Sequence, residues 1–378
     1  MCKESKIPIV SFFTGGGFLD MGFEEAGFDV VFTNEFDKDF VVLYESGMKG
    51  WGEKRGSGKE YKITSPDSIV SLSTEFIEKE AFPEGKPALW GIIGGPPCQD
   101  FSINGNLKGF EGVRGKMTVI FFNKIRKMKP AFFLMENVTG LLKCKDHLTR
   151  LDTIIKNHCK EDYYLARFVL NALEYGVPQF RERVFMVGVK KTLFKPPVLE
   201  NSFFDLQFEM RPPLYPDARK KYHWPDMNEF GAVITCPLDV PAELCVEHCL
   251  VKPEDREKGV ANIDECFALK GDAEARRLIR EGDTHRPSFK RLHRYRYSPT
   301  TCYGNNEVHL HPYENRRLSV REALRIQGVD DSYALPAKPG LSKKFKMTGN
   351  GVPVPLARMV AESLRDFVVK YYKDSQKN

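Results

Sequence analysis

The sequence lacks the features that mark membrane and exported proteins. No apolar run approaches the ~20 residues that a bilayer crossing requires. The N-terminal segment has no apolar core of the kind found in signal peptides. Internal repeats and long low-complexity tracts are also missing. We therefore expect a protein without a membrane partner that stays in the cytoplasm where it is made.

Cysteine is scarce and irregularly spaced. The 378 residues contain nine cysteines and no Cys-x-x-Cys pair, which argues against a disulfide scaffold and favours a reduced, intracellular protein. The tightest group is Cys236, Cys245, Cys249 and Cys266, with His248 beside it. Its spacing matches no common zinc pattern, so we favour ordinary free thiols over a zinc site and expect no metal.

Charge of one sign is not strongly in excess. The net charge of +6 is compatible with nucleic-acid binding but does not demonstrate it. With 42% hydrophobic and 29% charged residues, the composition is that of a globular protein, and the length suits one large or two modest domains.

Apolar runs alternate with helix-like segments through the first half of the chain. The runs predicted as strands are residues 8–13, 30–32, 89–93, 131–135 and 184–189, and residues 20–27 are predicted as a helix. This alternation predicts an α/β fold with a mostly parallel twisted sheet and helices on both faces. In such sheets ligands bind at the carboxyl ends of the strands.

The character of the chain changes after about residue 191. Residues 195–298 are richer in proline, charge and aromatics, which indicates a smaller, irregular domain. Regular patterns return with a capping box at Ser319 and Glu322 and a helix stop at Gly328. Residues 356–368 have the spacing of an amphipathic helix. The glycine-rich stretch 49–62 is predicted as a surface loop.

A glycine-rich turn follows the first predicted strand. Thr14-Gly15-Gly16-Gly17 would let a ligand approach the backbone closely. Glu35 ends the next strand, twenty positions after Gly15, where nucleotide-binding sheets hold ribose hydroxyls. A nucleoside cofactor is favoured over a purely structural turn, and the absence of a following Gly-Lys-Ser/Thr disfavours a P-loop.

Three further groups of residues follow predicted strands or lead into one. Cys98, held by Gly94-Gly95-Pro96-Pro97, is a candidate nucleophile, with a buried structural thiol as the alternative. Glu136 could share a proton, or could cap a helix. Arg181 and Arg183 alternate along an extended segment and could hold a base oxygen or a phosphate, or belong to a solvated charge cluster.

Taken in order, these residues resemble the cytosine-5 DNA methyltransferases. The resemblance rests on the glycine loop, the strand-end acid, Pro97-Cys98-Gln99, Glu136-Asn137-Val138 and Gln179-x-Arg181-x-Arg183. Residues 317–323 and 349–354 resemble the family's ninth and tenth motifs. The resemblance covers nearly the whole chain apart from about residues 195–294. Ser11 and Phe18 depart from the family pattern, Asp67 matches only loosely, and Gly328-Val329-Asp330 replaces the frequent Gly-Phe-Pro.

The resemblance implies a Rossmann-like methyltransferase that uses S-adenosylmethionine on a cytosine flipped out of double-stranded DNA. Cys98 would attack carbon 6, Glu136 would contact N3, and Arg183, with Arg181 near it, would bind the oxygen at position 2. The implied cofactor residues are Phe13, Thr14, Gly15, Gly17, Glu35, Phe36, Asp67, Pro97, Asn350 and Val352.

The same resemblance implies how the chain is organised. Residues 1–193 would form the catalytic and cofactor-binding domain, 194–340 the target-recognition domain and hinge, and 341–378 a segment that returns to the catalytic domain. The cations of residues 290–297 would contact phosphates, or form a solvated surface. We expect a monomer of the bacterial restriction–modification type, paired functionally with a restriction endonuclease.

Two other functions compete with this prediction. A transfer-RNA cytosine-5 methyltransferase is disfavoured because Thr300-Thr301-Cys302-Tyr303 stands where those enzymes carry Cys-Phe-Thr. A catalytically silent DNA-binding regulator is disfavoured because Cys98, Glu136 and Arg183 are all present.

Overall fold

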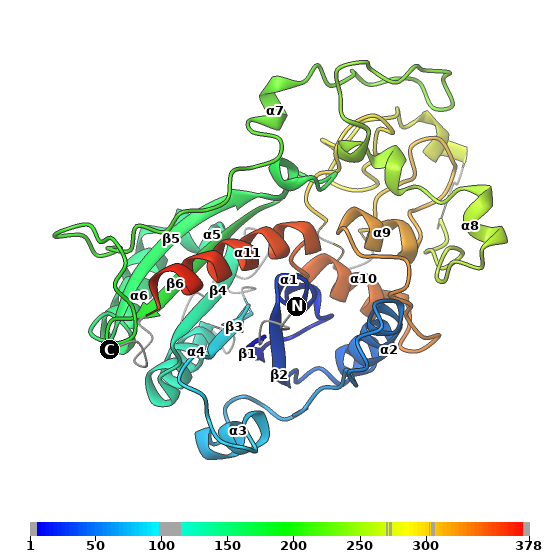
Figure 1. Cartoon of the computed structure of the whole chain (residues 1–378). Helices are drawn as coiled ribbons and strands as arrows, with labels where there is room; N and C mark the ends of the chain where they lie inside the picture. The colour runs from blue at the N-terminus through cyan, green and yellow to red at the C-terminus, as the bar shows by residue number, and fades with distance from the viewer. Residues whose placement is uncertain are drawn as a thin grey trace.

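The first half of the chain forms a six-stranded sheet with strand order β2-β1-β3-β4-β6-β5 (Figure 1). This computed structural model describes residues 6–97, 115–269, 271, 274–301, 303 and 307–372, so the predicted Cys98 and Gln99 lie outside the described residues. The strands are β1 (Ile7–Phe12), β2 (Phe28–Asn34), β3 (Gly91–Gly94), β4 (Phe132–Val138), β5 (Tyr163–Asn171) and β6 (Glu182–Lys190).

The sheet is mostly parallel, as the sequence predicts. β1 pairs in parallel with β2 and β3, and β3 pairs in parallel with β4, whereas β6 runs antiparallel to both β4 and β5. The five predicted strands are present, but β5 is absent from the prediction. It is an edge strand with only part of its residues buried, so it lacks the continuous apolar run of the central strands.

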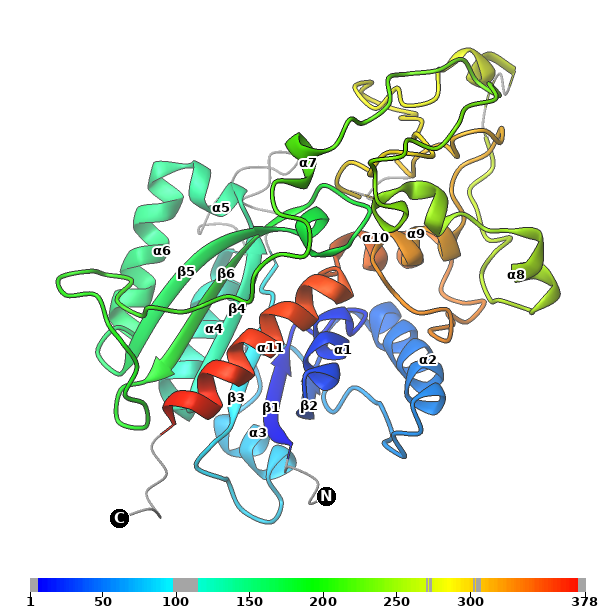
Figure 2. The same ribbon diagram turned by 45° about the horizontal axis from the view of Figure 1, so that its top comes forward.

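Helices cover both faces of the sheet because the central strands are apolar on both sides (Figures 1 and 2). Along β4, Phe132 and Leu134 join the core beneath α1 (Phe18–Glu25) and α11 (Val354–Tyr371). Phe133 and Met135 join a second core on the other face of the sheet. That second core also contains residues of α3 (Thr74–Ala81), α4 (Gly115–Met128) and α6 (Lys145–His158), and the short α5 (Gly140–Lys143) follows β4.

The prediction of a loop over residues 49–62 is wrong for its first part. Helix α2 spans Lys38–Lys54 and contains Gly47, Gly50 and Gly52. A Cβ at Gly47 would lie 2.1 Å from the Tyr333 ring, and one at Gly50 would lie 2.2 Å from the Ser332 carbonyl oxygen. These glycines therefore serve close packing against a distant segment, a cause that local sequence does not reveal.

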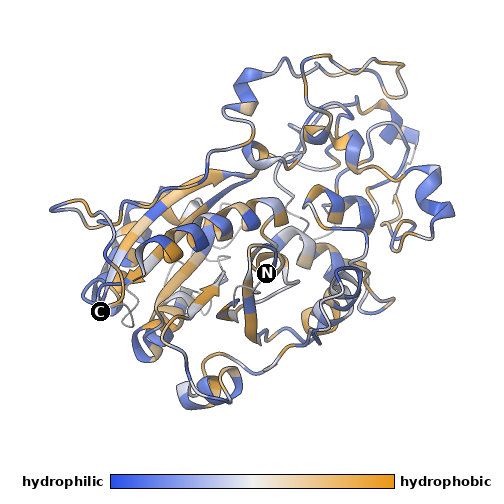
Figure 3. Ribbon diagram, viewed as in Figure 1, coloured by the Kyte–Doolittle hydropathy of each residue, from blue (hydrophilic) through white to orange (hydrophobic). Residues whose placement is uncertain are grey.

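The middle of the chain is irregular, as predicted. Between β6 and α9 the described residues form only short helical turns, and Figure 3 shows α8 as hydrophilic at the periphery. These turns are α7 (Ala218–Lys221), η3 (Ala242–Leu244), η4 (Val246–Cys249), α8 (Pro253–Glu257) and η5 (Glu274–Leu278).

One apolar core joins this irregular region to the sheet's helices. It contains Phe18 of α1, Leu43 of α2, Leu250 after η4 and Leu324 of α9 (Val320–Ile326). Ser319 and Glu322 form the predicted capping box, and the Ser319 amide donates to the Glu322 carboxylate over 2.7 Å. The predicted apolar face of residues 356–368 is buried within α11. None of the helices in the described residues is long and apolar enough to cross a membrane.

Candidate active site

The glycine turn after β1 and the acid after β2 meet at the carboxyl edge of the sheet. The Gly15 amide donates to Glu35 Oε2 over 2.9 Å, and Glu35 Oε1 accepts from the Asp37 amide over 2.8 Å. Gly15 has φ +58°, and a Cβ there would have no protein atom closer than Phe13 O at 4.0 Å. The backbone at Gly15 therefore faces open space, and burial raises the pKa of Glu35.

The other residues predicted for the cofactor lie in different settings. Phe36 is 69% exposed although it follows the buried end of β2. Asp67 is exposed, and its carbonyl accepts from Asn34 Nδ2 over 2.8 Å, which ties that segment to β2. Asn350 is exposed at the end of α10 (Leu341–Asn350), whereas Val352 is 5% exposed and packs in the core with α1 and α11.

A buried ion pair joins two neighbouring strands at the same edge. Arg183 Nε lies 3.0 Å from Glu136 Oε1, and both residues are 8% exposed. The antiparallel register of β4 and β6 sets Val138 opposite Arg183 and so brings the two side chains together. Burial raises the pKa of Glu136, although Arg183 and, from further away, Arg181 act to lower it.

The turn after β3 lies against this ion pair. A Cβ at Gly95 would lie 3.0 Å from Glu136 Oε2, so the Glu136 carboxylate packs against bare backbone at that position. Asn137 is buried, and its Nδ2 donates to the Pro96 carbonyl over 3.3 Å. Pro97 is the last described residue before Cys98. The chain thus reaches Cys98 from a turn held against Glu136 and Asn137.

Arg181 has different contacts from Arg183. It is fully buried, and its Nη2 donates to the carbonyls of Gly349 over 2.8 Å and Gly351 over 2.9 Å. Arg181 therefore anchors the segment that contains Asn350, while Arg183 contacts Glu136.

Comparison with known proteins places the sequence in a family. The sequence profile of the C-5 cytosine-specific DNA methylases matches residues 7–366. The chain belongs to this family. Type II methyltransferase M.NmeDI of Neisseria meningitidis serogroup C is 35% identical over 98% of this chain and 86% of its own length. Type II methyltransferase M.FnuDI of Fusobacterium nucleatum is 30% identical over 95% of this chain and 94% of its own.

The fold of this methylase also matches a solved structure. A putative DNA modification methyltransferase encoded within a prophage of E. coli superposes with a TM-score of 0.65. The match covers 96% of this chain and 100% of that chain at 22% sequence identity, so it supports the shared Rossmann-like fold.

Further buried residues hold the methylase's glycine turn and the start of β6 in place. The only signal for them in the sequence is that some lie next to the motifs already described. Ser11 Oγ donates to Asp20 Oδ1 over 2.6 Å and lies 3.2 Å from Thr14 Oγ1. Tyr333 Oη donates to the Gly16 carbonyl over 2.8 Å from a segment more than 300 residues away. Gln179 Nε2 donates to Gln327 Oε1 over 3.1 Å and joins the start of β6 to α9.

Two groups singled out in the sequence contain residues that are buried in the methylase. Cys245 and Cys249 are buried, and within the described ranges no three His, Cys, Asp or Glu side chains gather as a metal site. The expectation that residues 290–297 present cations to phosphates is wrong at two positions. Arg291 is fully buried against backbone carbonyls, and Arg294 pairs with Glu281 over 2.7 Å.

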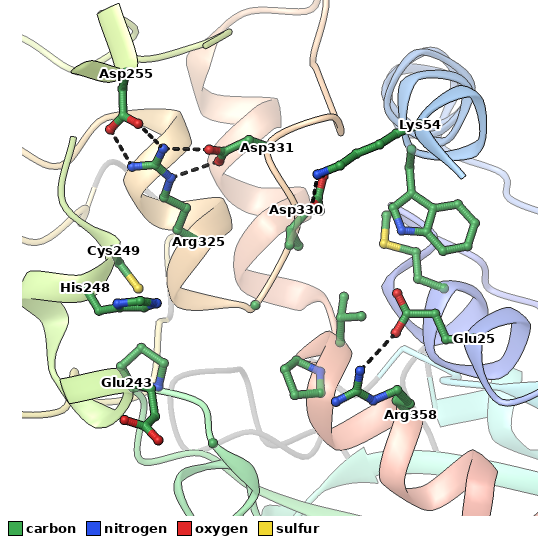
Figure 4. A pocket seen from close by; sticks show the side chains of 18 of the residues that line it. Glu25, Lys54, Glu243, His248, Cys249, Asp255, Arg325, Asp330, Asp331 and Arg358 are labelled. Carbon is green, nitrogen blue, oxygen red and sulfur yellow. Dashed lines mark hydrogen bonds and ion pairs between the residues drawn. The ribbon is translucent and has the colours of Figure 1, made fainter. Parts of the chain in front are cut away.

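A separate cavity of about 640 Å³ lies between α1, α2, α11 and the irregular region (Figure 4). Its charged groups neutralise one another: Arg325 pairs with Asp255 and Asp331, and Lys54 pairs with Asp330. None of the predicted site residues lines this cavity.

Proposed function

We propose that this C-5 cytosine-specific DNA methylase transfers a methyl group from S-adenosylmethionine to carbon 5 of a cytosine flipped out of a specific short duplex sequence. The observation that carries the proposal is the buried Glu136–Arg183 pair, 3.0 Å apart, against the Gly95-Pro96-Pro97 turn that leads directly to Cys98. The acid and the guanidinium would then contact the N3 and O2 edge of the cytosine, while the Cys98 thiol would attack the ring from one face.

The residues at the sheet edge fit S-adenosylmethionine. Gly15 would leave backbone open to the cofactor, and the buried Thr14 and Gly17 would hold the turn in shape. Glu35 would accept hydrogen bonds from the ribose hydroxyls of the cofactor. The exposed Phe36 ring and the half-buried Phe13 ring would offer apolar surface for the adenine. The family resemblance adds Asp67, Pro97, Asn350 and Val352 to the cofactor site. When bound, the cofactor supplies a methyl group on a positively charged sulfur.

Each proposed catalytic residue has one task. The Cys98 thiolate forms a bond to carbon 6 of the cytosine, which makes carbon 5 nucleophilic. Glu136 donates a hydrogen bond or proton to N3 as negative charge develops in the ring, and its raised pKa suits this role. Arg183 holds the oxygen at position 2. Methyl transfer to carbon 5 would leave the cofactor as a neutral thioether. The carbon 5 proton then passes to water, the electrons of that bond re-form the double bond to carbon 6, and the Cys98 thiolate leaves. Arg181 acts as a positioning residue through Gly349 and Gly351.

The similarity to two Type II methyltransferases suggests the biological setting. We propose that the chain acts as a monomer in a bacterial cytoplasm and protects DNA from a partner restriction endonuclease. Residues 1–193 would hold cofactor and base, residues 194–340 would contact the target sequence, and residues 341–378 would complete the cofactor site.

The test is methylation of mixed-sequence duplex DNA, mapped by bisulfite sequencing. We expect protected cytosines within one short motif, and no methylation by Cys98→Ser with cofactor binding retained. DNA that carries 5-fluorocytosine should trap the wild-type protein covalently, because carbon 5 then has no proton to lose. Full activity of Cys98→Ser would refute the mechanism. No protection by wild type that still binds the cofactor would refute DNA methylation.

A further inference from the structure

The irregular region contains one group of cations that the predicted active site does not use. Helix α7 carries Arg219, Lys220 and Lys221 in succession, and all three side chains are exposed. Ala218, the other residue of this helix, is fully buried in a small core with Leu173. The helix therefore packs through Ala218 and presents its three cations to solvent. We call these three residues the α7 cations.

The α7 cations differ from most cations around them because no acid neutralises them. In the described part of the chain, no ion pair of 4.0 Å or less involves any of the three. By contrast, Arg256 pairs with Asp264, Arg277 with Glu274, Arg280 with Glu229, Arg286 with Asp283, and Arg294 with Glu281. Three adjacent unneutralised charges form a local positive potential that suits a polyanion.

Contacts on both sides hold α7 in place. The Tyr215 and Asp217 amides donate to the carbonyl and the carboxylate of Glu174, both over 3.0 Å. Trp224 Nε1 lies 3.3 Å from the Ala218 carbonyl oxygen and 3.2 Å from that of Arg219. The helix is therefore fixed between the end of β5 and the irregular region, as Figure 2 shows. A fixed cluster binds a ligand with less loss of conformational entropy than a free loop.

The α7 cations lie close to the proposed catalytic pair. The Arg219 guanidinium lies 4.8 Å from the centre of the Phe180 ring. Phe180 precedes Arg183 by three residues, which an extended chain spans in at most about 11 Å. Arg183 contacts Glu136. A duplex that delivers a base to Glu136 and Arg183 would therefore bring its backbone to α7.

We propose that the α7 cations bind the backbone phosphates of the duplex DNA substrate beside the flipped cytosine. This inference rests on the proposed function and adds a phosphate-binding surface to it. Cation–phosphate contacts fix the position of the duplex and carry no sequence information. The α7 cations should therefore control affinity and its salt dependence, but not the choice of target motif.

The experiment compares duplex affinity as a function of salt for the full chain and for an α7 variant, R219Q/K220Q/K221Q. Each phosphate contact contributes about 0.9 to the slope of log affinity against log salt, so the variant should lose about 2.7 in slope. At ~0.1 M salt, one decade below 1 M, this difference in slope corresponds to a fall in affinity of about 500-fold. Arg219→Lys, which keeps the charge, should retain most of the wild-type slope.

A matched control removes three exposed lysines from α2, the following loop and α3. The variant K49Q/K62Q/K79Q has the same net charge as the α7 variant, and Lys49, Lys62 and Lys79 are exposed. Its slope should stay within one unit of the wild-type slope, and both variants should bind S-adenosylmethionine as the wild type does. An unchanged slope in the α7 variant, or an equal loss in the control, would overturn the proposal.

The failure of this inference is distinguishable from failure of the proposed function. If the wild type methylates duplex DNA while the α7 variant keeps its slope, only the phosphate surface is refuted. An altered target motif in the bisulfite map of the α7 variant would also count against the surface, because phosphates carry no sequence. If the wild type methylates RNA and not DNA, the proposed function fails first, and the phosphate surface fails with it.

Discussion

At the residue scale, the environment of Glu136 follows from its neighbours on two strands. Its carboxylate is buried between Gly95 and Arg183, so burial and an adjacent guanidinium act on its pKa in opposite directions. Burial has the larger effect, and the pKa is raised. The raised pKa favours the protonated carboxyl more than in an exposed glutamate, and the carboxyl can still accept a hydrogen bond from arginine.

Glu136→Gln tests this role. The amide can hydrogen-bond N3 but cannot transfer a proton, so we expect turnover to fall by about 10²- to 10⁴-fold with unchanged cofactor affinity. The measurement is single-turnover methyl transfer at saturating cofactor, with the exposed Glu84→Gln as a control outside the site. A loss of less than about tenfold would exclude Glu136 as the proton donor.

A second buried acid lies below the glycine turn. Asp20 accepts from Ser11 in the protein interior, and burial raises its pKa to about 7. Because the folded-state pKa exceeds the unfolded value of 3.8, this group stabilises the fold at low pH, and that stability is lost as pH rises through about 7.

Asp20→Asn should remove the loss of stability that ionisation of Asp20 causes at high pH. We expect the thermal midpoint of the variant to exceed that of the wild type by a few degrees at pH 8 and by clearly less at pH 5.5. The readout is thermal unfolding without cofactor across this pH range. A destabilised variant at pH 8 would show that the ionised Asp20 is needed by the fold.

At the element scale, the turn after β3 depends on the end of β4. Asn137 reaches across to the Pro96 carbonyl, and its own Oδ1 accepts from the Val138 amide over 2.9 Å. The two strands are neighbours in parallel register, so one amide side chain can hold the turn that precedes Cys98.

Asn137→Ala should loosen that turn without touching the cofactor. We expect the rate of covalent trapping on 5-fluorocytosine DNA to fall about tenfold or more, since small misplacements of a reacting group are costly. The dissociation constant for S-adenosylmethionine should stay within about twofold of wild type, as measured by calorimetry. Equal losses in trapping and cofactor binding would indicate general unfolding.

The helices and strands differ in how well the local sequence predicts them. Central strands and the capped helix α9 are predictable because their apolar runs and caps are local. Helix α2 was missed, and its last part was predicted as a loop, because its glycines pack against Tyr333 and Ser332, which are distant in the sequence. β5 was missed because an edge strand is only half buried.

At the scale of the whole molecule, the irregular region depends on a polar interior. His293, His309 and His311 are buried there, and burial lowers the pKa of these groups to about 4, 3 and 3. Each folded-state pKa lies below the value of 6.5 expected after unfolding. Unfolding therefore takes up protons below pH 6.5, and the fold loses stability as pH falls towards 4.

We expect this acid sensitivity to be steep. Three histidines that gain a proton on unfolding change the free energy of unfolding by up to about 4 kcal/mol per pH unit near pH 5. The measurement is urea unfolding at several pH values between 7.5 and 4.5. His309→Gln should lower the steepness by about one proton, and a flat profile below pH 6.5 would contradict this account.

The sequence by itself determined the α/β class, the strand-end positions of Glu35 and Glu136, and the family, because these depend on local order along the chain. Only the tertiary structure separated Arg183, beside Glu136, from Arg181, which is buried against Gly349 and Gly351. It also turned Arg291 inward and left the α7 cations exposed. The physical reason is that burial and ion pairing depend on partners distant in the chain, which residue type and spacing do not specify.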